Sequence, residues 1–248
     1  MEAQNHRAIA REYRGHPFVV VPDVVTDLCR ERVIVTEFVE GRRFDEILSL
    51  PEDERSRFGE ILFRFYVNGP FRHRLLNGDP HPGNSLFLAD GRVAFLDFGF
   101  FKRLPDDEMA VQLAMLHAVY DHDAQRLWDI SRDQGLVSGG GSEQVQRLFE
   151  MYESMCGWFL VDEPVTLTSD IATRAVLEQG NMRRGGYGDI KLPADQIVAA
   201  RAYVLVLAIL GQLQATNNWF RIGREVIFGD PPQTELGRIE HEHLTARV

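Results

Sequence analysis

The stretch of residues 77–99 limits the fold of this chain more than any other, because it reads as a β-hairpin with polar residues at its open end. Residues 85–89 and 92–96 are strand-like runs, separated only by Asp90 and Gly91. Asp-Gly between two such runs is the strongest short-range signal for a two-residue hairpin turn. The sequence therefore predicts two antiparallel strands joined by a tight turn.

The register of this predicted hairpin brings two oxygen-bearing side chains together. A two-residue turn makes Ala89 face Arg92, and counting outward makes Asn84 face Asp97. Directly facing residues have Cβ atoms about 5 Å apart and project from the same face of the sheet. Amide and carboxylate oxygens at that separation suit Mg²⁺, which takes one or two protein ligands together with phosphates and water. We therefore predict that Asn84 and Asp97 bind a magnesium ion.

A second carboxylate precedes the hairpin on a stiff loop. Asp79 lies five residues before Asn84, and the two prolines and the glycine within residues 80–83 make the link between them non-helical. A carboxylate that lies near a bound metal without ligating it can orient a hydroxyl group and accept its proton. We expect this role for Asp79. His81, within the link, is expected to hold the loop through hydrogen bonds to the backbone rather than to bind phosphate.

The spacing of these residues matches the protein-kinase pattern, in which a catalytic-loop Asp and Asn precede a metal-binding Asp-Phe-Gly. Here Asp79 and Asn84 are followed by Asp-Phe-Gly at residues 97–99, while Asn-Gly at residues 77–78 stands where kinases carry His-Arg. The alternative is an acidic turn beside an ordinary hairpin. The combination is far more specific than its parts, so we favour the kinase-type site and expect Phe98 to pack beneath it.

The rest of the chain reads as short strands followed by helices. Before the hairpin we expect a helix, a strand and an antiparallel pair of β-branched runs, over residues 3–14, 18–21, and 24–29 with 32–38. A longer helix has Ser49 as its N-cap, is interrupted by Gly69-Pro70, and is expected to continue for a further turn or two over residues 71–76. After the hairpin the pattern predicts a frayed polar tail from residue 229, preceded by helices over residues 106–120, 123–134, 143–159, 169–178 and 193–224.

Several apolar side chains are expected to fill the core. One set recurs at helical spacing, which favours core packing over a cofactor or lipid pocket: Met151, Met155, Trp158 and Phe159. Core packing is also expected of Phe100 and Phe101, which follow the Asp-Phe-Gly segment.

Charge and hydropathy argue against several classes of function. The 248 residues carry a formal net charge of -10, whereas nucleic-acid binding needs a basic face. The longest apolar run, residues 202–210, is far shorter than the ~20 residues that span a bilayer. The charged N-terminus has no signal-peptide core, and Cys29 and Cys156 are expected to be reduced thiols. We expect no nucleic-acid partner, no transmembrane segment, and a location that is cytoplasmic or peripheral to the membrane.

Four segments resemble one family of atypical kinases. GDPHPGN and LDFG, preceded by VIVTEFVEG and HPFVVVPDV, resemble the UbiB/ADCK (AarF-like) family. The resemblance covers residues 1–105 and continues more loosely through LGQLQATNNW at residues 210–219. It implies an α+β, protein-kinase-like fold with a mostly helical C-lobe, a catalytic-loop β-hairpin and a remnant of the N-lobe sheet. It also implies ATP and Mg²⁺ as cofactors, kinase or ATPase activity, and a role in isoprenoid-quinone (ubiquinone-type) biosynthesis.

The resemblance also assigns roles to single residues. Asp79 matches the catalytic-loop aspartate, and Asn84 and Asp97 match the two metal ligands. Glu2 matches the glutamate of the N-lobe helix that pairs with the ATP-binding lysine. The hinge, which meets the adenine through backbone groups, corresponds to Glu37, Phe38 and Val39.

The sequence departs from the family pattern upstream of Glu2. The family's lysine-bearing strand, alanine-rich nucleotide loop and Lys-x-Gly-Gln extension are not in this sequence, and both lysines, Lys102 and Lys191, follow the hinge. We therefore expect weak or no activity from this chain alone. The expected organisation is a partial N-lobe, a kinase-like C-lobe and a polar tail, over residues 1–40, 41–228 and 229–248.

Two other functions stay open. The chain can be a non-catalytic pseudokinase or a fragment without the ATP-binding lysine. It can also be a small-molecule kinase of the aminoglycoside or choline type, which uses a Gly-Asp-x-His-Pro-Gly-Asn loop. Pro80, where those enzymes usually carry Leu, and Phe98-Gly99 favour the UbiB/ADCK interpretation. Expected partners are a nucleotide and either a quinone or lipid precursor or a quinone-biosynthesis protein.

Overall fold

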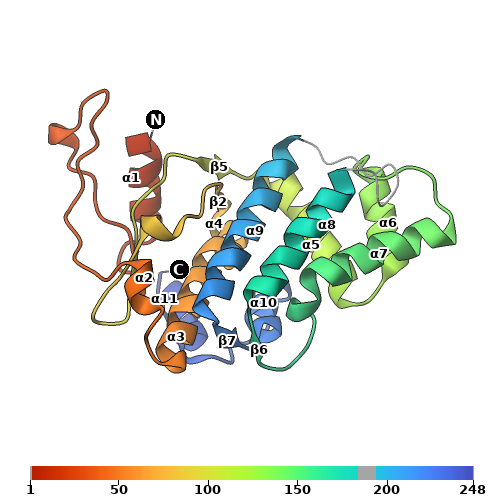
Figure 1. Ribbon diagram of the computed structural model, residues 1–248. Helices are drawn as coiled ribbons and strands as arrows, with labels where there is room; N and C mark the ends of the chain where they lie inside the picture. The colour runs from red at the N-terminus through yellow and green to blue at the C-terminus, as the bar shows by residue number, and fades with distance from the viewer. Residues whose placement is uncertain (1, 184–193, 248) are drawn as a thin grey trace.

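The computed structural model describes residues 2–183 and 194–247, which form an α+β chain dominated by helices (Figure 1). Helix α1 (Glu2–Glu12) and the extended segment that follows it stand at one end of the molecule. Helices α6 (Ala124–Asp133) and α7 (Ser142–Cys156) lie at the other end. The predicted helix over residues 3–14 is therefore confirmed, and Gly15, with a φ of +71°, follows its last turn.

The predicted hairpin forms the centre of a three-stranded sheet. Strand β3 (Ser85–Phe87) pairs antiparallel with β4 (Val93–Phe95), and β1 (Val19–Val20) pairs parallel with the other edge of β4. The strand predicted over residues 18–21 thus joins the hairpin. Each residue of the central strand β4 is at most 1% exposed, because the strand has neighbours on both edges and is covered on both faces.

The predicted two-residue turn is wrong, because the hairpin closes through three residues. Phe87 faces Val93, and the Leu88 N–H donates to the Arg92 carbonyl at 2.9 Å, which leaves residues 89–91 as the loop. Gly91 ends this loop with a φ of +82°. A type I turn followed by a left-handed residue is the usual way to close a three-residue hairpin loop. The register of the strands is therefore shifted by one residue from the prediction.

Residues 24–38 run antiparallel as predicted but form no regular strands. Val24 and Thr36 make an isolated bridge, and a 3₁₀ turn, η1 (Thr26–Leu28), interrupts the first run. Leu28 is 58% exposed, so little packs against this ribbon. A two-stranded ribbon that packs against nothing is only marginally stable, which explains why the ladder is broken.

The predicted interruption at Gly69-Pro70 is confirmed. Helix α3 (Glu52–Phe63) widens into a π-helix, η2 (Arg64–Asn68), before α4 (Gly69–His73) begins. Pro70 has no N–H to donate to the carbonyl of Tyr66, so the regular α-helical hydrogen-bond pattern cannot continue through it. The π-helical turn closes its hydrogen bonds over one more residue than an α-helical turn, so the side chains that follow it are rotated about the helix axis.

Two neighbouring predictions are wrong. The N-cap position of α3 is Pro51 rather than Ser49. The helix was expected to continue to residue 76, but Arg74 has a φ of +57° and ends it. Strand β2 (Leu75–Asn77) follows and pairs antiparallel with β5 (Phe101–Arg103).

The remaining helices follow the apolar pattern of the sequence closely until residue 213. Besides α6 and α7 they are α2 (Phe44–Ile47), α5 (Asp106–Tyr120), α8 (Ser169–Arg183), α9 (Ala194–Leu213), α10 (Trp219–Ile227) and α11 (Glu235–Thr245). The helix predicted over residues 193–224 is two helices, because β7 (Thr216–Asn217) pairs with β6 (Val165–Thr166) between them, and its predicted start lies outside the described residues. No helix in the described ranges combines the length and apolarity that crossing a bilayer requires.

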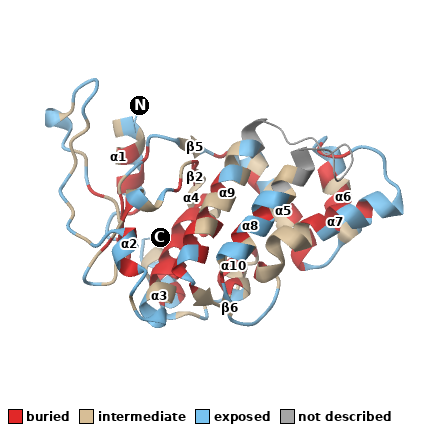
Figure 2. Cartoon of the chain, viewed as in Figure 1, coloured by how far each residue is buried: buried red, intermediate tan, exposed pale blue. Residues whose placement is uncertain are grey.

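The buried side chains concentrate where the hairpin meets α3 and η2 (Figure 2). The ring of Phe65, on η2, stacks on Phe95 of β4 with centroids 3.6 Å apart. Phe98 is fully buried, as predicted, whereas Phe100 is 47% exposed and the prediction that it packs in the core is wrong. Met151 and the side chains that follow it at helical spacing do pack against the core, as predicted.

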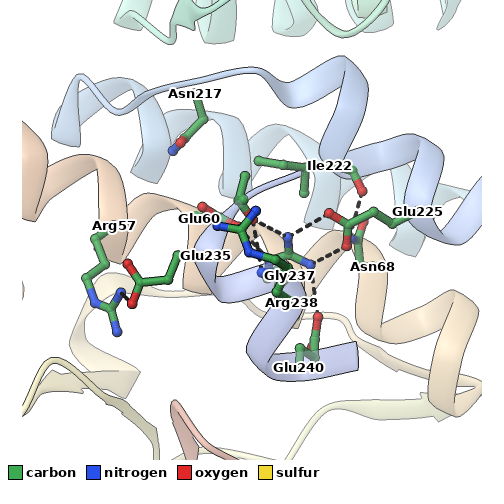
Figure 3. A network of polar contacts seen from close by, with 12 residues as sticks. Arg57, Glu60, Asn68, Asn217, Ile222, Glu225, Glu235, Gly237, Arg238 and Glu240 are labelled. Atoms are coloured by element: carbon green, nitrogen blue, oxygen red, sulfur yellow. Dashed lines mark hydrogen bonds and ion pairs between the residues drawn. The ribbon is translucent and has the colours of Figure 1, made fainter. Parts of the chain in front are cut away.

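The C-terminal tail does not fray, contrary to the prediction, because its polar residues bind a buried arginine. The side chain of Arg64 has no exposed surface and lies 2.8, 2.7 and 2.9 Å from Glu60, Glu225 and Glu240 (Figure 3). Thr234 caps α11 by accepting the N–H of Gly237 at 2.9 Å. The network fixes α11 against α3 and α10.

Candidate functional site

Asn84 and Asp97 meet at the open end of the hairpin, although not through the predicted register. The N–H of Leu96 donates to the Asn84 carbonyl, so Asn84 faces Leu96. Asp97 is one residue further and in a regular strand would point to the opposite face. Both residues lie outside the strands, however, and the Asn84 Nδ2 donates to the Asp97 Oδ2 at 3.5 Å. The predicted meeting is confirmed, but the irregular backbone beside the strands produces it.

A buried amide, Asn77, joins the loop of Asp79 to the segment of Asp97. Its Oδ1 accepts the N–H of Asp79 at 2.9 Å, and its Nδ2 donates to the Asp97 carbonyl at 3.4 Å. Asn77 is 8% exposed and ends strand β2. From the sequence alone, Asn77 is recognisable only as the residue that stands where kinases carry histidine. That correspondence is the one sequence feature that points to a positioning role for Asn77.

Asp79 also pairs with an arginine from a distant helix. The Nη2 of Arg201, on α9, donates to the Asp79 Oδ1 at 2.8 Å. The two side chains are 57% and 49% exposed, so both reach solvent. Arg201 could not be predicted as part of the site from the sequence, because 122 residues separate the pair and no local pattern connects them.

The loop between Asn77 and Asp79 is packed tightly from two sides. A methyl group on Gly78 would lie 2.6 Å from the Phe100 ring and 2.9 Å from the Val198 Cγ1. Glycine is therefore required here for lack of space. His81 accepts the Gly83 N–H through its Nδ1 at 3.0 Å, which confirms that this histidine holds the loop.

Helix α1 covers the Asp-Phe-Gly segment with one face. The Nδ2 of Asn5 donates to the Phe98 carbonyl at 3.2 Å, and the His6 ring packs edge-on against the Phe98 ring at 4.7 Å. A methyl group on Gly99 would come within 4.0 Å of the Glu2 Oε2. Glu2, Asn5 and His6 are spaced i, i+3 and i+4, which places them on one face of a helix.

Two buried groups beneath the site have shifted pKa values. Burial lowers the pKa of His6, although the Pro22 carbonyl at 2.7 Å and the charge of Glu2 oppose the shift. Burial raises the pKa of Tyr66, the Ser85 hydroxyl partly offsets this, and the charges of Asp97 and Asp79 raise it further. Tyr66 therefore stays protonated and adds no negative charge to the site.

The predicted hinge residues lie on another segment. The Oε2 of Glu37 accepts the Asp23 N–H at 3.0 Å, Phe38 is 92% exposed, and Val39 is half-buried. This segment reaches the hairpin through the antiparallel bridge between residues 42 and 87. The structure thus brings Glu2, Asp79, Asn84 and Asp97 together around the Asp-Phe-Gly segment, whereas residues 37–39, predicted to be the hinge, lie on the segment that leads to the other end of β3.

The side chains of Asn84 and Asp97 carry oxygen atoms of the kind that bind a hard divalent cation. The Asn84 Nδ2 rather than its Oδ1 faces Asp97, so the amide must turn to ligate a cation beside the carboxylate. Asp97 is exposed and accepts the Gly99 N–H at 2.8 Å through Oδ1, which fixes its carboxylate beside Asn84. One carboxylate and one amide form the small protein ligand set with which Mg²⁺ binds phosphate groups. The described parts of the chain contain no group of three or more His, Cys, Asp or Glu side chains arranged as a metal cluster.

Comparison with known proteins identifies the family. The sequence profile of the ABC1 atypical kinase-like domain matches residues 1–131, more than half of the chain. The chain is 32% identical over 109 residues to the chloroplastic Protein ACTIVITY OF BC1 COMPLEX KINASE 3 of Arabidopsis thaliana, a match over 43% of this chain and 15% of that protein. It is 30% identical over 124 residues to the mitochondrial atypical kinase COQ8B of Rattus norvegicus, over 50% of this chain and 24% of that protein. The matches thus span less than a quarter of these relatives.

A solved structure confirms the fold. Rv3197 of Mycobacterium tuberculosis, determined in complex with erythromycin, superposes with a TM-score of 0.70 at 24% sequence identity, over 93% of this chain and 58% of that chain. This agreement confirms the predicted α+β, kinase-like fold. The profile match, the relatives and the fold agree, and the chain belongs to the ABC1 atypical kinase-like family.

Proposed function

We propose that this chain carries the Mg-ATP site of an ATP-dependent phosphotransferase or ATPase. The observation that carries the proposal is the meeting of Asn84 and Asp97 at 3.5 Å, with Asp79 tied to the same segment through Asn77. Phosphoryl transfer depends mainly on positioning and charge stabilisation, which is what such an arrangement supplies.

Each side chain has a distinct role in this proposal. Asn84 and Asp97 would hold Mg²⁺, which when bound neutralises the charge of the ATP phosphates. Asp79 orients the acceptor hydroxyl, or water, and accepts its proton. Arg201 places a positive charge beside Asp79, where the transferred phosphoryl group lies during the reaction.

The remaining predicted nucleotide contacts belong to the same proposal. The backbone of Glu37, Phe38 and Val39 would contact the adenine. Glu2, which lies beside Gly99, would pair with the ATP-binding lysine of the family.

The biological setting and domain organisation are also proposals. Resemblance to the UbiB/ADCK proteins supports a role in isoprenoid-quinone biosynthesis, with a quinone or lipid precursor or a quinone-biosynthesis protein as partner. It supports a cytoplasmic or membrane-peripheral location. Residues 1–40 would be the end of an N-lobe, residues 41–228 the C-lobe, and residues 229–248 a tail.

Calorimetric titration with Mg-ADP tests the site directly. We expect Asp97→Asn to weaken Mg-dependent binding by about tenfold or more, because it removes the charged metal ligand. Asp90→Asn, in the exposed hairpin turn, is the matched control and should bind as the unmodified chain does. Equal binding by the Asp97 variant would refute the assignment. Absence of binding by the unmodified chain would favour the non-catalytic alternative.

A further inference from the structure

A large cavity lies among helices from both halves of the chain and reaches Asn77 of the candidate site. Its volume is about 440 Å³, and α4, α5, α7, α9 and α10 contribute to its wall. An apolar cavity of roughly 150 Å³ is already large enough to bind benzene. This volume falls in the range of small-molecule binding sites.

The wall of the cavity is mostly apolar and adaptable. Met115, Met151 and Met155 line it together with the aromatic side chains of Phe71 and Trp158. Methionine side chains are flexible and polarisable, so they adjust to the shape of a hydrocarbon. The residues predicted from their spacing to be core residues therefore pack against the core and also line this cavity.

One fully buried amide on the wall has an unused acceptor. Asn68 is 0% exposed, and its Nδ2 donates to the Ile222 carbonyl at 3.3 Å. Within the described part of the chain, its Oδ1 has no hydrogen-bond partner. A buried acceptor without a donor is unfavourable, so a donor in the cavity would be favoured at this position once the Asn68 side chain turned its Oδ1 towards the cavity.

The backbone that carries Asn68 is also unusual. Tyr66, Val67 and Asn68 all line the cavity, and all belong to the π-helix η2. Single π-helical turns are rare and occur frequently at functional sites. The π-helix, the unpaired amide oxygen and the methionine-rich wall are three separate features of the same cavity.

We propose that this cavity binds a hydrophobic small molecule that bears one hydrogen-bond donor, such as a hydroxyl group on a hydrocarbon body. The hydrocarbon would contact the methionine and aromatic wall, and the hydroxyl would donate to the Asn68 Oδ1. The proposal does not depend on nucleotide binding or on phosphoryl transfer.

Two isomeric probes test the proposal by calorimetry on the whole chain. 1-Octanol has the hydrocarbon body and the donor, whereas heptyl methyl ether has the same atoms without a donor. We expect saturable binding of one octanol per chain, a raised melting temperature, and at least about tenfold weaker binding of the ether. No saturable binding of octanol, or equal binding of both probes, would overturn the proposal.

Variants locate the binding site. Ala202 is 4% exposed and lines the cavity, so Ala202→Leu should fill part of it and weaken octanol binding by about tenfold or more. Ala110, exposed on α5 and outside the wall, provides the control Ala110→Leu, which should bind octanol as the unmodified chain does. Octanol binding that survives Ala202→Leu unchanged would place the probe elsewhere and overturn the proposal.

A further variant tests the role of the amide. Asn68→Leu should remove the preference for octanol over the ether, and a retained preference would contradict the assigned role of Asn68. Because this change also leaves the Ile222 carbonyl unpaired, circular dichroism must confirm that the variant folds. If it does not fold, Ala202→Leu and the two probes decide the question by themselves.

Discussion

Arg201 on α9 donates a hydrogen bond to Asp79 at 2.8 Å, which joins a C-terminal helix to the loop of the proposed catalytic aspartate. About half of each side chain is exposed. Exposed ion pairs of this kind contribute only ~0–1 kcal/mol to stability. The pair is therefore better explained by what it does for Asp79 than by what it adds to the fold.

Replacing this arginine should lower activity without unfolding the protein. We expect Arg201→Gln to reduce the kcat of phosphate release from Mg-ATP by about tenfold or more, because a positive charge beside the transferred group is lost. The melting temperature should change by no more than about 2 °C. Arg221→Gln, which breaks the equally exposed pair with Asp162, is the control and should leave phosphate release unchanged. A normal kcat in Arg201→Gln would argue against a role in transfer.

Gly78→Ala should destabilise the chain. The added methyl group would lie 2.6 Å from Phe100 and 2.9 Å from Val198, so one of the packed segments must move. We expect a loss of about 1–3 kcal/mol in the free energy of unfolding, measured with urea. Combining it with Val198→Ala should recover part of the loss.

The matched glycine control is Gly157→Ala. A methyl group there meets nothing within 4 Å, and the backbone is helical, with a φ of -55°. Its free energy of unfolding should change by no more than about 0.5 kcal/mol. If both alanine variants were equally stable, the close packing around Gly78 would have no energetic consequence.

Replacing the buried Arg64 should lower the free energy of unfolding far more than replacing an exposed arginine. Arg64→Met removes a buried charged partner from each of the carboxylates of Glu60, Glu225 and Glu240, so we expect a loss of about 3–5 kcal/mol in the free energy of unfolding. Arg57→Met, on the neighbouring helix α3, breaks an exposed pair with Glu235 at 4.0 Å and should cost less than about 1 kcal/mol. Similar urea midpoints for the two variants would contradict the structural importance of the network.

A buried histidine should make stability depend on pH. The Nδ1 of His16 accepts backbone N–H groups at 3.4 and 3.1 Å, so the folded chain keeps its Nδ1 unprotonated, and burial lowers the pKa of His16. The unfolded chain binds a proton near the ordinary value of 6.5. The unfolded state therefore gains protons first, and the free energy of unfolding should fall as pH drops below 6.5.

Glu240, which pairs with His16, extends this loss of stability to lower pH. Burial alone would raise the pKa of Glu240, but the hydrogen bond from His16 and the charges of Arg72 and Arg64 outweigh it and lower the pKa from 4.5 to about 2. Its stabilising contribution is complete above 4.5 and is lost as pH falls towards 2. Tyr13, His73 and His243 are further titratable groups close to His16.

Urea unfolding between pH 7.5 and 3 measures both steps. His16→Gln should reduce the decline that begins below pH 6.5, to which the lowered pKa values of His6 and His73 also contribute. It should also weaken the decline below 4.5, because the hydrogen bond from His16 helps to lower the pKa of Glu240. His241→Gln, on the exposed side of α11, is the control and should keep both steps. A curve for His16→Gln that matches the unmodified chain would assign the upper step to another group.

Local patterns in the sequence predicted most of the helices and the hairpin. The apolar spacing within residues 106–120 is repeated within one helix and does not depend on distant partners, so it was reliable. The hairpin was also predicted, but its turn was wrong by one residue, because the turn type depends on backbone angles at Gly91 that Asp-Gly alone does not fix. The meeting of Asn84 and Asp97 was therefore predicted correctly for an incorrect reason.

Contacts between distant segments could not be predicted in this way. Arg201 meets Asp79 across 122 residues, and Arg64 meets Glu240 across 176. An isolated stretch such as residues 229–248 looks polar and unstructured, because its charges have no visible partner in the nearby sequence. Only the packed fold shows that those charges are paired.

Asn77 is part of both the cavity and the candidate site. It forms part of the cavity wall, and its amide holds the backbone of Asp79 and of Asp97. If two ligands each favour a particular conformation of the same side chain, the binding of one changes the affinity for the other. The factor by which the first ligand changes the affinity for the second equals the factor by which the second changes the affinity for the first. A hydrophobic molecule in the cavity and a nucleotide at the candidate site would thus change each other's affinity through the side chain of Asn77, without touching.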